Sequence, residues 1–131
     1  FITISTGAVT PVSIRGGPFQ TPRMVIRCAE NVTSILVVFE IFIGSRERIV
    51  ESRVDETRLQ RATWAASSDN KTVGLWRGAQ AIPFIKSLLH GESLTLWMTP
   101  HNASGVAVTF NIKSLERHLG KVSAACGWSF T

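Results

Sequence analysis

The stretch ILVVFEIFI at positions 35–43 decides the class of fold. Its odd-numbered residues are all apolar, and its even-numbered residues are apolar except for Glu40. Apolar residues on both faces of an extended segment are typical of a central strand, and the pattern predicts one over 34–43. Glu30-Asn31 and Gly44-Ser45 supply breaks on either side, so residues 24–28 and 34–43 are expected to form a β-hairpin.

Alternation of side chains predicts further strands along the chain. We expect them over 48–55, 72–76, 94–98 and 106–112. In the first of these, Val50 and Val54 share one face, and the opposite face, with Arg53, should meet water. In the third, Trp97 lies opposite Leu96 and Met98, which favours the solvent face for the indole ring.

Two short helices are expected between and after these strands, at about 81–90 and 114–125. Pro83 suits the first turn of the earlier helix, and Gly91 lies just beyond its end. Ser114 is placed to cap the N-terminus of the later helix. The predicted fold is therefore mainly β: an antiparallel β-sandwich or a strongly curved sheet with two short helices at its edges.

Length and composition predict a single domain over residues 1–131, because 44% of the residues are apolar and 18% are charged. Residues 1–22 are rich in proline and glycine, which indicates a loop-rich N-terminal strand region before a core at 23–128. No run of about eighteen apolar residues is present, so we expect no membrane-spanning segment. The chain begins without a leader, as a processed secreted protein or a trimmed chain would.

The net charge of +5 favours anionic partners, but the charges are scattered. The arginines between positions 46 and 61 are interrupted by Glu47, Glu51, Asp55 and Glu56. A nucleic-acid groove would need a cleaner basic stripe with aromatic residues between the charges. We therefore expect no nucleic-acid partner.

Catalytic and metal-binding motifs are missing from the sequence. It contains no GxSxG elbow, P-loop, GxGxxG or HExxH motif. His90, His101 and His118 lack the spacing of metal ligands to one another or to cysteine, and surface positions are the simpler interpretation. We predict a non-enzymatic protein with no catalytic residues, metal or cofactor.

A charged and aromatic surface is the candidate binding site. Arg53 and Asp55 project from one strand face, and Arg58 and Arg61 follow closely. Such a group is either a solvated ion-pair ladder or a recognition patch, since arginine is favoured at interfaces. Trp64 is a candidate aromatic anchor for this patch.

The four tryptophans, Trp64, Trp76, Trp97 and Trp128, admit two interpretations. Exposed rings gathered in one cleft would stack on sugars, and Trp97 is the candidate for that role. The alternative is that most of them cover core edges and helix–sheet junctions.

Two cysteines lie near opposite ends of the chain. Cys28 falls in a predicted strand, and Cys126 continues the helical apolar stripe Leu115, Leu119, Val122. Both side chains are expected to point into the core, so they can meet and form a disulfide. A bridge of that kind favours an oxidising compartment.

An ordered series of short segments carries a family resemblance. These are MVIRC at 24–28, RVD at 53–55, TWAAS at 63–67, FIKSL at 84–88, LTLWMTP at 94–100, VTFNI at 108–112 and ACGW at 125–128. From Arg23 to Trp128 the chain resembles the VasI/TagO family, accessory proteins encoded with bacterial type VI secretion systems. The sequence departs from the family pattern at Asn111 and Lys113, near positions expected to be Asp and Gly.

The resemblance implies a leader of the signal-peptide or lipoprotein type, which allows a lipid anchor in a longer form, and periplasmic residence. It also implies an accessory role and brings no catalytic residues. Our leading hypothesis is a non-enzymatic periplasmic accessory protein that contacts envelope proteins, secretion-apparatus proteins or the cell wall. The alternative is a glycan- or peptidoglycan-binding module that uses exposed tryptophans and arginines.

Overall fold

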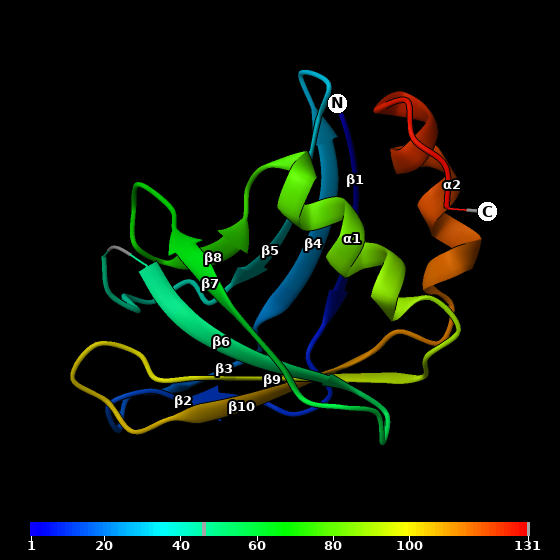
Figure 1. Ribbon diagram of the computed structural model, residues 1–131. Helices are drawn as coiled ribbons and strands as arrows, with labels where there is room; N and C mark the ends of the chain where they lie inside the picture. Colours follow the sequence, from blue (N-terminus) through cyan, green and yellow to red (C-terminus); the bar gives the residue numbers. More distant parts are fainter. Residues whose placement is uncertain (46, 131) are drawn as a thin grey trace.

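The computed structural model describes residues 1–45 and 47–130, and a strongly curved antiparallel sheet forms most of it (Figure 1). Within these residues the sheet has eight strands. In spatial order they are β1 (Ile2–Gly7), β4 (Arg23–Ala29), β5 (Val32–Val38), β8 (Thr72–Leu75), β7 (Gln60–Ala66), β6 (Glu47–Val54), β9 (Ser93–Met98) and β10 (Val106–Asn111). A separate hairpin joins β2 (Val12–Ser13) to β3 (Phe19–Gln20). The prediction of a mainly β fold with a strongly curved sheet is confirmed.

The curvature brings the two edge strands of the sheet together at one point. Just after β1, the backbone N–H of Val9 donates to the carbonyl oxygen of Thr109 in β10 at 2.8 Å. The sheet is therefore almost closed. We call the line along which β1 faces β10 the seam.

Two helices, α1 (Gly78–Leu88) and α2 (Leu115–Ala125), complete the fold. Figure 1 shows α1 in front of β4 and β5, and α2 alongside β1. Ile85 of α1 and Leu119 of α2 are fully buried in the same apolar cluster as Ile35, Val50 and Trp64 from the strands. Burial of these alternate strand residues against the helices is the main stabilising contribution to the fold.

The hairpin of β4 and β5 is confirmed, but the prediction that its second strand continues to residue 43 is wrong. The strand ends at Val38, because Glu40 takes a left-handed backbone conformation with φ of 63° that no strand residue adopts. Phe39 and Ile43 nevertheless remain buried, and their backbone N–H groups donate to Lys71 and Asn70. The apolar run at 35–43 thus indicated burial correctly and strand length incorrectly.

Both helices form close to their predicted positions, but their N-termini differ from the prediction. Since α1 begins at Gly78, Pro83 lies inside the helix and not in its first turn. Ser114 precedes α2 as predicted, yet its side chain makes no capping hydrogen bond. Its φ and ψ of −105° and 13° depart from the extended conformation typical of a capping serine, and its hydroxyl is left for other contacts.

The two cysteines form a disulfide that ties α2 to the sheet. Cys28 in β4 is bonded to Cys126, which directly follows α2, and their Cα atoms are 5.8 Å apart. Close by, the indole N–H of Trp128 donates to the hydroxyl of Thr33 in β5 at 2.8 Å. The predicted meeting of the strand and helix cysteines is therefore confirmed.

Candidate binding surface on the outer face of the sheet

Three side chains line up across β7, β6 and β9 on the outer face of the sheet. Glu51 of β6 is the register partner of Arg61 on one side and of Trp97 on the other. Directly opposed residues of antiparallel strands point to the same face, so these three form one row. The prediction that Trp97 points away from Leu96 and Met98 is confirmed, since those two are buried and the indole is half-buried.

This row lies in an open groove of about 770 Å³. Ile49 stands one row further along the same face and is 51% exposed, so it adds apolar area beside the ring of Trp97. Glu47 and Thr99 also line the groove. We call the surface formed by Glu47, Ile49, Glu51, Arg61, Trp97 and Thr99 the outer groove. It offers apolar contact area beside charges of both signs.

Arg53 and Asp55 have structural partners within β6 and its neighbours. Arg53 lies opposite Thr95 and forms an ion pair with Glu56 at 2.9 Å. Asp55 accepts hydrogen bonds from the backbone N–H groups of Glu92 and Ser93, at 3.2 and 2.9 Å. Its carboxylate thereby holds the chain at the start of β9.

Arg58 is exposed and lies apart from the outer groove. With Asp55, Phe84 and His90 it borders a smaller depression of about 190 Å³. The four charged residues of the predicted patch therefore do not form one surface, and Arg53 borders neither hollow. Arg61 joins Trp97 in the outer groove, and Arg58 joins Asp55 in the smaller depression.

The prediction that Trp64 is a surface anchor is wrong. Trp64 is 1% exposed and packs edge-on against Phe84, with ring centroids 5.4 Å apart. The side chain points inward because residues 60–66 form β7, a strand that the sequence patterns did not reveal. Small residues dominate that strand and give it almost no apolar alternation.

Two other tryptophans use their polar edge for structure. The indole N–H of Trp76 donates to the carbonyl oxygen of Ala65 at 2.8 Å, and the guanidinium of Arg27 lies 5.6 Å from the ring centroid. Trp128 bonds to Thr33 as described above. These contacts fit the interpretation of tryptophans at core edges, and they leave Trp97 as the aromatic ring of the outer groove.

Sequence reasoning missed Ile49, Glu47 and Glu51 as members of the site. A signal existed, because Ile49 shares strand parity with Glu51 and Arg53 and interrupts the polar face of β6. Together with the ring of Trp97, this isoleucine forms the apolar part of the outer groove, and exposed apolar patches mark interaction sites. Recognising it required knowing which strands flank β6, and pairing register is not visible in the sequence.

Metal ligation finds no geometric support in the part of the chain that the structure describes. No group of three histidine, cysteine, aspartate or glutamate side chains is placed to hold an ion there. His90, His101 and His118 are all exposed. Neither α1 nor α2 is long and apolar enough to cross a membrane, and this holds for every helix of residues 1–45 and 47–130.

Comparison with known proteins identifies a family. No curated protein and no solved structure matches the chain. A family model described as type VI secretion system VasI and EvfG matches residues 2–128. The match begins in β1 and so extends over the N-terminal region that the sequence resemblance, starting at Arg23, left out. Since the match covers almost the whole sequence, this chain belongs to the VasI/EvfG family of type VI secretion system proteins.

Proposed function

We propose that this protein is a non-enzymatic, periplasmic accessory component of a type VI secretion system, and that it acts through protein contacts made by the outer groove. The observation that carries the secretion role is the family match over residues 2–128. An accessory protein of this kind would bind envelope or secretion-apparatus proteins.

The disulfide supports the periplasmic part of the proposal. Cys28 and Cys126 are bonded to each other, and no other cysteine occurs in the sequence. Structural disulfides persist in oxidising compartments such as the bacterial periplasm and are rare in the reducing cytosol. In cell fractionation we expect the oxidised protein with the periplasmic contents. Recovery of the reduced protein from the cytosol alone would contradict the assignment.

The composition of the outer groove supports a protein-contact role. Trp97 and Arg61 are residue types enriched at binding hot spots, and Ile49 adds exposed apolar area beside them. Glu47 and Glu51 supply polar groups near this apolar centre, as in the polar rims of protein interfaces. The combination fits a partner with its own apolar anchor.

Quantitative cross-linking in intact envelopes tests this role. We expect Trp97→Ala and Ile49→Ala to lower the recovery of cross-linked secretion partners while thermal unfolding stays cooperative. Phe19→Ala is the matched control, because Phe19 is 72% exposed and lies in β3, outside the groove. An equal cross-linking profile for all three variants would remove the groove from the proposal.

A second candidate function is glycan binding by the same groove. The half-buried Trp97 beside Arg61 and Glu51 combines a stacking ring with polar neighbours. Muropeptide binding should change the tryptophan fluorescence of the unmodified protein in a saturable way and should leave the fluorescence of Trp97→Phe nearly unchanged. Equal responses of the two proteins would point away from stacking on Trp97.

A further inference from the structure

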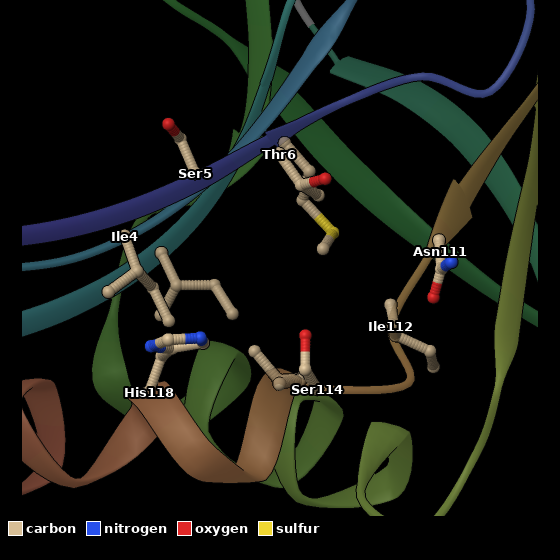
Figure 2. A pocket seen from close by; sticks show the side chains of 10 residues that line it. Ile4, Ser5, Thr6, Asn111, Ile112, Ser114 and His118 are labelled. Carbon is tan, nitrogen blue, oxygen red and sulfur yellow. The ribbon is translucent and has the colours of Figure 1, made fainter.

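A second cavity lies at the seam, away from the outer groove. Its volume is about 370 Å³, within the range of about 300–1,000 Å³ typical of ligand pockets. Figure 2 shows its walls: β1 on one side, the end of β10 and the start of α2 on the other. We call it the seam pocket.

The walls of the seam pocket are the edges of strands. Ile4, Ser5 and Thr6 of β1 all line it, and so do Asn111 and Ile112 on the opposite side. Consecutive strand residues point to opposite faces, so a cavity that touches three in a row lies against the edge of the strand and not against one face. β1 is the first strand in the spatial order of the sheet and pairs only with β4 within the described chain. Its main-chain groups on the seam side are therefore available to another strand.

The floor of the pocket is apolar. It is formed by Met24 and Ile26 of β4, which are 3% and 1% exposed, together with Ile4, Ile112 and Leu115. A floor of this size and character accommodates one or two aliphatic side chains.

The polar rim carries hydroxyl and amide groups, and a positive charge lies beside it on the other face of β1. The hydroxyl of Ser114, free of any capping bond, points into the cavity (Figure 2). Arg23 donates to the hydroxyl of Ser5 at 2.9 Å, so its guanidinium lies beside the edge strand β1, on the face of the sheet opposite Ile4 and Thr6. No carboxylate is present among the residues lining the pocket in the described chain.

The nearest acidic groups on the flanking segments already have basic neighbours. Glu92 lies 3.8 Å from the ammonium group of Lys113, and Glu116 lies 3.6 Å from the imidazole of His90. These contacts leave the guanidinium of Arg23 as the charge beside the edge of β1, and the imidazole of His118 also lines the pocket. An acidic segment is therefore the complementary partner.

We propose that the seam pocket binds an extended, acidic peptide segment of a partner protein. The segment pairs its main chain with the edge of β1, inserts an aliphatic side chain over Met24 and Ile26, and brings a carboxylate to Arg23. This is strand addition to a sheet edge, in which main-chain hydrogen bonds supply affinity and a side-chain pocket supplies specificity. The site is separate from the outer groove and would complete the sheet between β1 and β10.

Fluorescence anisotropy with a labelled heptapeptide, acetyl-Thr-Asp-Leu-Thr-Val-Asp-Thr-amide, tests the proposal. Its two aliphatic residues share one face of an extended chain, and its two aspartates share the other face, on which Arg23 lies. We expect saturable binding that weakens as salt is raised, because the contact between the aspartates and Arg23 is exposed. Replacing both aspartates with lysine should weaken binding at least about tenfold. Alternate backbone nitrogens of an extended peptide point to opposite sides, so methylating one of the two alternating sets should also weaken binding at least about tenfold.

Variants of the protein locate the binding site. Ser114→Trp fills the pocket from its rim without removing a capping bond, and we expect a loss of affinity of about tenfold or more. Ala124→Trp is the matched control, because Ala124 is exposed near the far end of α2 and should keep full affinity. Arg23→Ala should weaken binding of the acidic peptide several-fold. Arg77→Ala, at an exposed position before α1, should leave the binding unchanged.

Three results would overturn the proposal. They are equal peptide affinities of Ser114→Trp and Ala124→Trp, no effect of N-methylation at either alternating set of nitrogens, and no saturable binding up to about 1 mM peptide. Trp97→Ala is expected to bind the peptide normally. The peptide assay therefore fails or succeeds independently of the outer groove.

Discussion

At the scale of single residues, Gly74 in β8 occupies a position with no room for a side chain. A Cβ atom there would lie 2.7 Å from Cδ2 of Leu36 and 2.8 Å from the carbonyl oxygen of Ile35. The leucine can rotate, but the carbonyl belongs to β5, which pairs with β8, and cannot move without disturbing that pairing. We expect Gly74→Ala to lower the free energy of unfolding by about 1–3 kcal/mol in a urea titration.

Gly120 provides the matched control for this substitution. It lies in α2, and a Cβ atom at that position meets no atom within 4 Å. Because alanine favours the helix by about 1 kcal/mol over glycine, Gly120→Ala should raise the free energy of unfolding. Effects of the same sign at the two positions would contradict the explanation by steric contact.

Single residues also show why part of the site could not be predicted from the sequence. Trp64 and Trp97 are the same residue type in strands of similar length, yet one is 1% exposed and the other lines the outer groove. Leu96 and Met98 revealed the direction of Trp97, because they alternate with it. Trp64 has only alanine and threonine as near neighbours, so its strand gave no alternation from which to read a direction.

At the scale of elements, the turn between β7 and β8 depends on one carboxylate. Asp69 accepts hydrogen bonds from the hydroxyl of Ser67 at 2.5 Å and from the backbone N–H of Lys71 at 3.1 Å. The Ser67 bond first, and the Lys71 bond second, lower the pKa of Asp69 below its ordinary value. A lowered pKa means that the ionised carboxylate stabilises the turn above the ordinary pKa, and that this contribution is lost as pH falls through the lowered pKa.

NMR titration of the Asp69 carboxyl group measures this directly. In Ser67→Ala we expect the pKa of Asp69 to rise towards its ordinary value, because the largest stabilising contact of the ionised form is gone. Ser68→Ala is the control, since the Ser68 side chain has no part in the causes of the shift. A similar pKa in Ser67→Ala and the unmodified protein would contradict the assigned cause.

Elements were predicted well where local pattern alone decides them. The break predicted at Glu30-Asn31 is present. Asn31, like Asn70 and Asn102 in other turns, has φ between 50° and 65°, a conformation that asparagine tolerates well. The end of β5 was not predictable. The residues expected at its end, such as Phe39 and Ile43, are apolar because they are buried in the core and not because they lie in the strand. The strand ends where Glu40 takes a left-handed conformation, and a glutamate side chain does not mark such a position in the sequence.

At the scale of the whole molecule, the disulfide closes a loop of 98 residues in sequence separation. In the chain-entropy description, a bridge of that span stabilises the folded state by about 4–5 kcal/mol. We expect reduction to lower the melting temperature by roughly 10–20 °C, and hydrogen exchange to quicken first in α2. Cys28→Ala/Cys126→Ala should reproduce the effect and be insensitive to reductant. Equal melting temperatures of the oxidised and reduced protein would contradict it.

The mainly β class, both helices and the cysteine pair were predictable, because each follows from spacing along the chain. The near-closure of the sheet was not. It depends on β1 and β10 meeting at Val9 and Thr109, and nothing local in either strand marks it as an edge. The seam pocket exists only because of that meeting, so it too was invisible in the sequence.

The Cys28–Cys126 bond also determines how the molecule responds to mechanical force. Tension applied between the two termini passes along residues 1–28, crosses the sulfur–sulfur bond and leaves through the last few residues. The chain between the two cysteines carries no load, so stretching detaches β1 from β4, then strips β4 from β5 as far as Cys28, and stops there. In a single-molecule pulling experiment we expect an extension on the order of 100 Å for the oxidised protein and on the order of 400 Å after reduction. The oxidised protein held by its two ends would thus yield by a short, limited length and keep most of its sheet intact.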